Sequence, residues 1–101
     1  MKLKYTPRAI QDLQNIKSYI GQTLQNPKAA DRVVKNLLDA GHNLKMHPKL
    51  GLSLAEKLNM ETDLRCLIRE NYLILYRVEN EMILVARVLD GRTDYARILF
   101  R

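Results

Sequence analysis

The last third of the chain, Leu64–Phe100, holds three consecutive runs of strand-forming residues, and this feature constrains the fold most. The runs are Leu64–Arg69, Tyr72–Val78 and Met82–Leu89, with only a few polar residues between them. Such closely spaced strands predict an antiparallel three-strand meander. The middle run does not alternate polar and apolar residues, so we expect both faces of its strand to be covered.

The segment before the meander begins with a strand and a helix. Met1–Tyr5 alternates polar and apolar residues as a short strand does. Thr6-Pro7 is a typical helix start, because Thr caps the helix and Pro is tolerated at its first position. Apolar residues at three- and four-residue steps predict that this helix ends between Gly21 and Gln25.

A second helix and a long connection complete the predicted elements. Asn26-Pro27 repeats the start signal, and helical spacing of apolar residues continues from Lys28 to about Met46. Lys49–Asp63 reads as a connecting segment long enough to be an ordered loop. A short helical turn is predicted at the end of the chain, where Tyr95, Ile98 and Leu99 fall at helical spacing.

These elements predict an α+β fold in one domain over residues 1–101. Two adjacent helices with a short connection pack as an antiparallel hairpin, and the sheet is the only surface that their apolar faces can cover. We therefore expect a curved four-stranded sheet, made of the N-terminal strand and the meander, with the hairpin on one face.

Composition limits the partners and the location. The formal charge is +6, from 17 Lys and Arg against 11 Asp and Glu, which favours a polyanion or an acidic protein as partner. The single cysteine, Cys66, cannot form an intramolecular disulfide, and the N-terminus lacks the apolar core of a signal peptide. A cytoplasmic protein is expected, with no membrane span, no metal site and no cofactor.

The order of the predicted elements and the residues within them together resemble the RelE/ParE family of bacterial toxins from type II toxin–antitoxin pairs. The resemblance covers nearly the whole chain and is most specific at its C-terminal end, where Tyr76-Arg77-Val78 is followed by Arg87-Val88-Leu89-Asp90-Gly91-Arg92-Thr93-Asp94. Weaker matches are Pro7, Ala9, Asp12-Leu13, Ile16 and Tyr19-Ile20 in the first helix, and Leu44, Pro48 and Gly51 after the second. The resemblance implies a growth-inhibiting toxin that a cognate acidic antitoxin holds inactive.

The family implies two alternative activities. RelE-like members cut messenger RNA on the ribosome, which requires a base, an acid and cations around the reacting phosphate. ParE-like members trap DNA gyrase without catalysing a reaction, so that contact surface matters most. A third alternative is a degenerate member that still binds its antitoxin but has lost its toxicity.

Several residues depart from the nuclease pattern. RelE-like nucleases carry lysines on one face of the first meander strand, where this chain has Leu64 and Cys66. Leu73 stands where an arginine would follow the aromatic residue of the second strand. Arg92 matches the arginine after the last strand, but Ile98 occupies the place six residues later, where a catalytic tyrosine is expected. These differences favour the ParE-like branch, with DNA gyrase as the target.

No catalytic residue is assigned on this interpretation. If the chain is instead a nuclease, the candidates are Arg92, Tyr95, Arg65 and Arg69. For binding the target or the antitoxin, the candidates are Arg69, Arg77, Arg87, Arg92, Asp94, Tyr95 and Arg97. Arg77 and Arg87 lie in otherwise apolar strands, so each is either half of a structural ion pair or a contact for a partner. For Arg92, a structural pair with Asp94 is the corresponding alternative.

Overall fold

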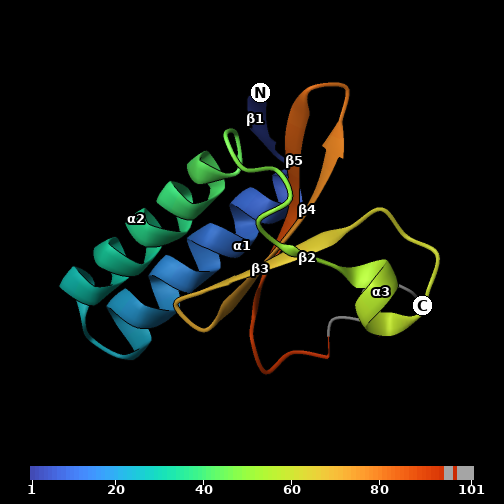
Figure 1. Cartoon of the computed structure of the whole chain (residues 1–101). Coiled ribbons are helices and arrows are strands. Elements are labelled where there is room, and N and C mark those ends of the chain that lie inside the picture. The colour runs from blue at the N-terminus through green and yellow to red at the C-terminus, as the bar shows by residue number, and fades with distance from the viewer. Residues whose placement is uncertain (95–96, 98–101) are drawn as a thin grey trace.

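The computed structural model describes residues 1–94 and 97, and it has the α+β architecture that the sequence predicts (Figure 1). In chain order its elements are β1 (Lys2–Tyr5), α1 (Pro7–Ser18), a π-helical turn (Tyr19–Thr23), α2 (Pro27–Asn43), β2 (Leu52–Ser53), α3 (Leu54–Leu58), β3 (Arg65–Arg69), β4 (Tyr72–Glu79) and β5 (Met82–Asp90).

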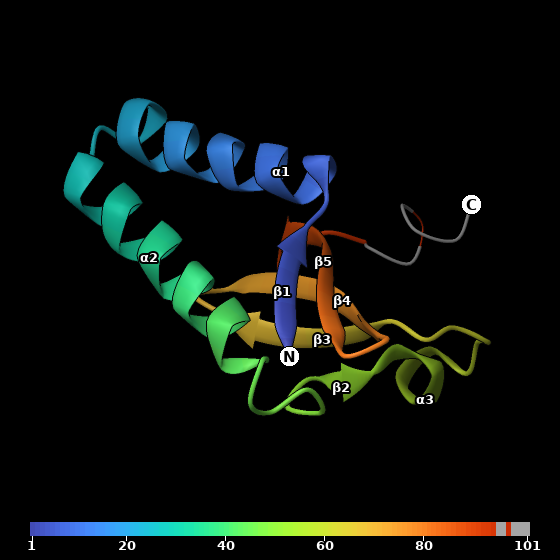
Figure 2. The same cartoon turned by 90° about the horizontal axis from the view of Figure 1, so that it is seen from above.

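The strands form one sheet in the order β1-β5-β4-β3-β2. β1 pairs with β5 in parallel, and the other neighbours are antiparallel, as predicted for the meander. α1 and α2 form a hairpin on one side of the strands, and α3 lies on the other side (Figure 2). No helix in residues 1–94 is long and apolar enough to cross a membrane.

Both long helices begin at the predicted capping residues. Thr6 accepts a hydrogen bond from the Ala9 amide at 3.0 Å, and Asn26 accepts one from the Ala29 amide at 3.2 Å. The first helix continues through the π-helical turn to Thr23, within the predicted range. α2 ends three residues before the predicted Met46, because the chain changes there to three-residue hydrogen bonds.

Each hairpin of the meander closes through a two-residue turn. Pairing of Arg69 with Tyr72 and of Glu79 with Met82 leaves Glu70-Asn71 and Asn80-Glu81 as the turns. All four turn residues have positive φ, between 44° and 65°, which is the type I′ geometry that matches the twist of the strands. Neither turn contains the glycine by which such turns are usually recognised.

Two apolar clusters cover the two faces of the sheet. The first lies under the helix hairpin and includes Ile74, Tyr76, Ile83 and Val85. The second joins Leu54 of α3 to side chains on the opposite face of β3, β4 and β5. The prediction that the middle strand is covered on both faces is confirmed.

The expectation of a four-stranded sheet was wrong, because β2 adds a fifth strand. β2 and α3 both arise from Lys49–Asp63, which the sequence presented as a connection. β2 has only two residues, too few for a pattern. Tyr76 fixes this segment from inside the core, because its hydroxyl donates to the Pro48 carbonyl at 2.7 Å and accepts from the Gly51 amide at 2.9 Å. The predicted C-terminal helical turn falls largely outside the described residues.

Candidate functional site

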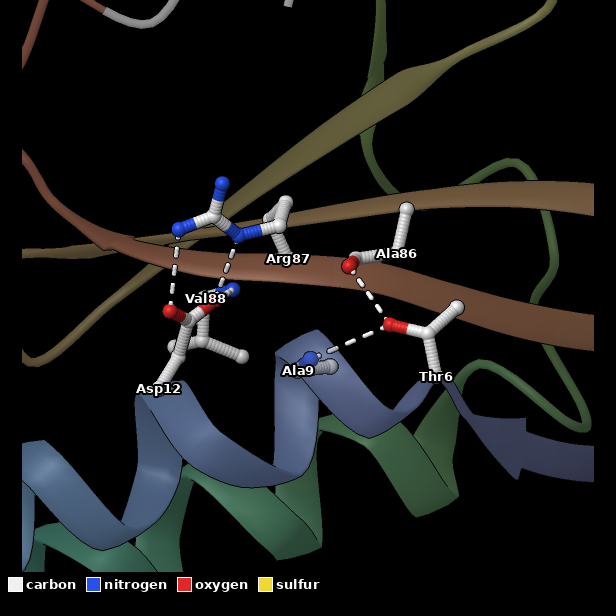
Figure 3. A network of polar contacts seen from close by, with 6 residues as sticks. All are labelled: Thr6, Ala9, Asp12, Ala86, Arg87 and Val88. Carbon is white, nitrogen blue, oxygen red and sulfur yellow. Dashed lines mark hydrogen bonds and ion pairs between the residues drawn. The ribbon is translucent and has the colours of Figure 1, made fainter. Parts of the chain in front are cut away.

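An ion pair joins α1 to β5 beneath the helix hairpin (Figure 3). Asp12 accepts hydrogen bonds from Arg87 Nε at 2.8 Å and Nη2 at 3.0 Å. The amide of Val88 donates to the same carboxylate at 2.9 Å. Both side chains are largely buried, and the hydrogen bond to Asp12 raises the pKa of Arg87. Arg87 is therefore held inside the protein by a bidentate contact.

Thr6 makes a second contact between α1 and β5. Its hydroxyl donates to the Ala86 carbonyl at 2.7 Å while it caps the helix through the Ala9 amide (Figure 3). With the Asp12 pair, this bond fixes the first two turns of α1 against the last strand. These polar contacts add to the apolar packing of Ala9 and Ile16, which also holds α1 on the sheet.

At the end of β5, Arg92 folds back onto Asp90. Arg92 Nε and Nη2 lie 3.2 and 3.3 Å from the two carboxylate oxygens, and the Arg92 amide donates to Asp90 at 2.8 Å. The Arg92 hydrogen bond lowers the pKa of Asp90, and the same pair raises the pKa of Arg92. The pair is open to solvent, with 91% of the Arg92 side chain exposed. Asp90, and not Asp94, is thus the acidic partner of Arg92.

The β3–β4 turn is tied both to α2 and to the end of β5. Glu70 accepts hydrogen bonds from Asn36 at 2.6 Å and from Arg32 at 3.1 Å, and the Asn36 bond is the main reason that the pKa of Glu70 is lowered. The Gly91 amide donates to the Asn71 carbonyl at 2.8 Å. A Cβ at Gly91 would lie 2.7 Å from that oxygen, so the glycine of the C-terminal motif permits this close approach.

The Arg92–Asp90 pair and the β3–β4 turn border an open groove at one end of the molecule, which we call the hairpin-tip groove. It has a volume of about 830 Å³ and lies where the turn between α1 and α2 faces the β3–β4 turn and the end of β5. Its walls are mostly apolar and carry two arginines and two acids. The lining residues are Tyr19, Ile20, Leu24, Ala29, Arg32, Val33, Ile68, Glu70, Asn71, Tyr72, Leu73, Asp90, Gly91 and Arg92.

Two tyrosines stand near Arg92 in this groove. Tyr19 opens the π-helical turn at the end of the first helix, and half of its surface is exposed. Tyr72 lies at the start of β4, and burial, followed by the nearby Asp90 and Tyr19, raises its pKa. A π-helical turn frequently marks a functional position in a helix, and here it brings an aromatic ring into the groove.

The sheet register separates the arginines proposed from the sequence. Arg69 pairs with Tyr72, which pairs with Asp90, so Arg69 lies at the same end of the sheet as Arg92. Arg65 lies four residues back along β3, about 13 Å from Arg69. The cations suggested for a nuclease therefore do not converge on one phosphate-sized site.

Arg65 and Arg77 both make contacts at the end of the sheet opposite the hairpin-tip groove. Arg65 donates to the Gly51 carbonyl at 2.7 Å and to the Lys49 carbonyl at 3.3 Å, which holds the loop before β2. Arg77 Nε lies 3.4 Å from Asp63, an ion-pair distance without hydrogen-bond geometry, and Nη1 lies 3.7 Å from Glu79.

The C-terminal candidates are only partly described. Arg69 donates to the neighbouring Ile68 carbonyl at 3.0 Å and is exposed. Asp94 and Arg97 are exposed as well, and the Arg97 amide lies 3.4 Å from the Asp94 carboxylate. Tyr95, which was a candidate for both activities, lies outside the described residues, as does Ile98.

The positions at which a nuclease would carry cations are apolar and buried. Leu64, Cys66 and Leu73 all belong to the second cluster, beneath Leu54 of α3. Each is at most 5% exposed, and burial raises the pKa of the Cys66 thiol. These three side chains carry no charge and are buried in the core, so they cannot supply the cations that a nuclease needs around a phosphate.

Sequence reasoning missed the hairpin-tip groove. Helical spacing places Tyr19 on the apolar face of the first helix, and Ile68 stands among the other apolar residues of its strand. The one available signal was Leu24, an apolar residue in the short turn between two helices, where polar residues are usual.

Comparison with known proteins agrees with this architecture. A chain titled "Chromosomal ParDE TA system from P. aeruginosa" superposes with a TM-score of 0.73 at 24% sequence identity, over 89% of this chain and 95% of that one. No curated protein matches the sequence. The family model described as "ParE toxin of type II toxin-antitoxin system, parDE" matches residues 3–95. The chain therefore belongs to the ParE toxin family of type II toxin–antitoxin systems.

Proposed function

We propose that this protein is a cytoplasmic toxin that inhibits DNA gyrase by binding it, without catalysing a reaction, and that a cognate acidic antitoxin neutralises it. The family is described by its toxin–antitoxin pairing, and this supports the proposal of an antitoxin partner. The net charge of +6 suits an acidic partner.

The buried state of Leu64, Cys66 and Leu73 carries the choice of a binding toxin over a nuclease. RNA cleavage by the 2′-hydroxyl needs positioned acid, base and cationic groups around one phosphate. Here the corresponding sheet face is an apolar cluster closed by α3. The arginines that could replace the lysines are divided between the two ends of the sheet. Binding makes no such demand, because it requires a complementary surface and no tuned pKa.

Arg92 is our main candidate for the target-binding surface. Its side chain is almost fully exposed at the end of β5, and its surface pair with Asp90 is of a kind that contributes little to stability. A partner carboxylate or phosphate can therefore replace Asp90 at small cost. Arg69 is exposed at the same end of the sheet, and Asp94 and Arg97 are exposed after β5. Tyr95 follows Asp94 in sequence.

The test compares both activities on the purified toxin. Gyrase incubated with plasmid and toxin should accumulate cleaved DNA, and ribosomes translating a message should leave that message intact. Arg92→Ala should lose the gyrase effect by at least about tenfold. The matched control is Arg8→Ala. Arg8 is an exposed arginine at the N-terminal end of α1, and this variant should keep the gyrase effect.

Each other outcome rejects a defined part of the proposal. Transcripts cut on the ribosome would identify a nuclease and overturn the non-catalytic mechanism. Inactivity in both assays, together with a stable antitoxin complex, would identify a degenerate antitoxin-binding protein. Full toxicity of a folded Arg92→Ala variant would remove this arginine from the target-binding surface.

A further inference from the structure

The loop between α2 and β2, residues 44–51, carries apolar side chains that are open to solvent (Figure 2). Met46 is 79% exposed and Leu52, the first residue of β2, is 60% exposed, which are the highest values for large apolar side chains among the described residues. Leu50 lies between them and is 46% exposed. From Met46 to Leu52 the chain spans at most about 22 Å, so one partner surface of standard size can cover all three. We call these three residues the loop patch.

The backbone of this loop is fixed to the sheet by two side chains. The Tyr76 hydroxyl donates to the Pro48 carbonyl and accepts from the Gly51 amide. Arg65 donates to the Gly51 carbonyl at 2.7 Å and to the Lys49 carbonyl at 3.3 Å. Gly51 is buried, and a Cβ there would lie 2.8 Å from the Tyr76 hydroxyl. The loop is therefore already ordered, so that a partner binds it without a large cost in backbone entropy.

The charged side chains of the same stretch are all basic. No acidic residue occurs between Asp39 and Glu56, whereas Lys45 and Lys49 both lie in the loop. Within the part of the chain that the structure describes, neither lysine forms an ion pair. A surface that complements the loop therefore carries carboxylates as well as apolar side chains.

A hollow of about 300 Å³ beside the loop has room for a side chain of the partner. Asp63 in its wall lies 3.4 Å from Arg77 Nε, so the charge of this carboxylate is offset within the protein. Arg65 donates through Nε and Nη2 in the described contacts, which leaves Nη1 for a ligand. The hollow therefore fits an acidic side chain. Its lining residues are Met1, Pro48, Lys49, Asp63, Arg65 and Val78.

These features favour a protein over the other occupants of such a surface. A second copy of this chain would set Lys45 and Lys49 against like charges, which disfavours self-association through the loop. A nucleic acid would pair with the lysines but leave the loop patch in water, because residues 44–52 contain no Phe, Tyr or Trp on which a base could stack. A membrane surface would cover the loop patch but leave the hollow unfilled.

From these observations we infer that the loop patch docks on an acidic surface of DNA gyrase and is a second anchor of the toxin on its target. Apolar side chains of gyrase cover the loop patch, and a carboxylate enters the hollow beside Lys49 and Arg65. This inference rests on gyrase as the target in the proposed function. It adds a contact at the end of the sheet opposite Arg92, so that the toxin is held at both ends.

The test measures binding of the toxin to immobilised gyrase that holds a DNA duplex, by surface plasmon resonance. Met46→Asp and Leu52→Asp should each weaken binding at least about tenfold, because each places a carboxylate against an acidic surface. The matched controls are Ile10→Asp and Leu38→Asp, which change exposed apolar residues of α1 and α2. They should bind within about threefold of the wild type. Circular dichroism establishes that each variant is folded.

Two further measurements use the wild-type toxin. Gyrase should slow hydrogen exchange of the amides in residues 44–53, and neither the duplex alone nor vesicles of anionic phospholipid should retain the toxin through the loop patch. Retention on either one that Met46→Asp abolishes would assign the loop patch to that ligand and overturn the inference.

The remaining outcomes separate this inference from the proposed function. Wild-type affinity in both loop variants, or protection confined to other segments, would reject the second anchor and leave gyrase as the target. Binding that depends on the loop patch, without accumulation of cleaved DNA, would keep the anchor and reject the proposed inhibition. A wild-type toxin that does not bind gyrase would reject both the anchor and the proposed target.

Discussion

Asp12 is the side chain on which the contact between the first helix and the last strand depends. Its carboxylate satisfies the Arg87 guanidinium and the Val88 amide together, across 75 residues of sequence. The sequence indicated that an arginine inside an apolar strand needs a partner. It could not identify Asp12, because helical spacing alone does not determine which residue of β5 a helix face meets.

Removing the Asp12 carboxylate should destabilise the protein. Asp12→Ala leaves a largely buried guanidinium and an amide without an acceptor, so we expect a loss of about 2–3 kcal/mol in the free energy of unfolding, measured in urea. Asp12→Ala combined with Arg87→Met should cost at least about 1 kcal/mol less than the sum of the single losses. The control is Asp39→Ala, which breaks an exposed pair with Lys35 and should cost less than about 0.5 kcal/mol. Equal losses for both aspartates would contradict this role of Asp12.

The long elements were predictable because their patterns are long. Both helices, β1 and the meander strands appear within a few residues of the predicted bounds. The two-residue strand β2 and the five-residue helix α3 were missed, because they are held by tertiary contacts such as the Tyr76 hydroxyl. The groove was missed for a related reason. Its walls come from four separate segments, and nothing in any single segment shows that they meet.

The meander turns lack glycine, and replacing one residue should stabilise the β4–β5 hairpin. Glu81 has φ of 64°, a conformation that costs a non-glycine residue roughly 1–2 kcal/mol. Glu81→Gly removes that cost and restores the Asn-Gly pair typical of type I′ turns. After the entropy that glycine loses on folding, a gain of about 0.5–1 kcal/mol should remain in urea unfolding. Glu79→Gly, within β4, should instead destabilise the protein, partly through its lost contact with Arg77. A destabilised Glu81→Gly variant would show that its side chain makes a contact worth more than the strain.

Basic side chains outnumber acidic ones in this protein, with 17 Lys and Arg against 11 Asp and Glu. Most acidic side chains of the described residues lie within ion-pair distance of a lysine or an arginine. The excess of six positive charges is therefore not compensated locally. Such a field accelerates encounter with an acidic partner, while short-range contacts determine how long the complex lasts.

Salt should consequently slow association with the antitoxin more than it speeds dissociation. Between about 0.01 M and 1 M salt the screening length falls from roughly 30 Å to 3 Å, so the association rate should fall at least about tenfold. The dissociation rate, which depends on short-range contacts, should change much less. Both rates are measured by stopped-flow fluorescence. Lys2→Gln with Lys4→Gln lowers the net charge from +6 to +4 and should flatten the salt dependence. A salt effect confined to dissociation would argue against electrostatic steering.

The parallel pairing of β1 with β5 has a consequence for how the toxin is made in the cell. Leu3 aligns with Ile83, so the first strand has no neighbour in the sheet until the 80 residues that follow Leu3, up to Ile83, have been synthesised. At about 5–20 residues per second, synthesis of those 80 residues takes roughly 4–16 s. During that interval β1 cannot pair and α1 has no β5 to bind. Nascent chains that have not yet reached β5 therefore lack the completed sheet, and β1 joins the sheet only after β5 has been made.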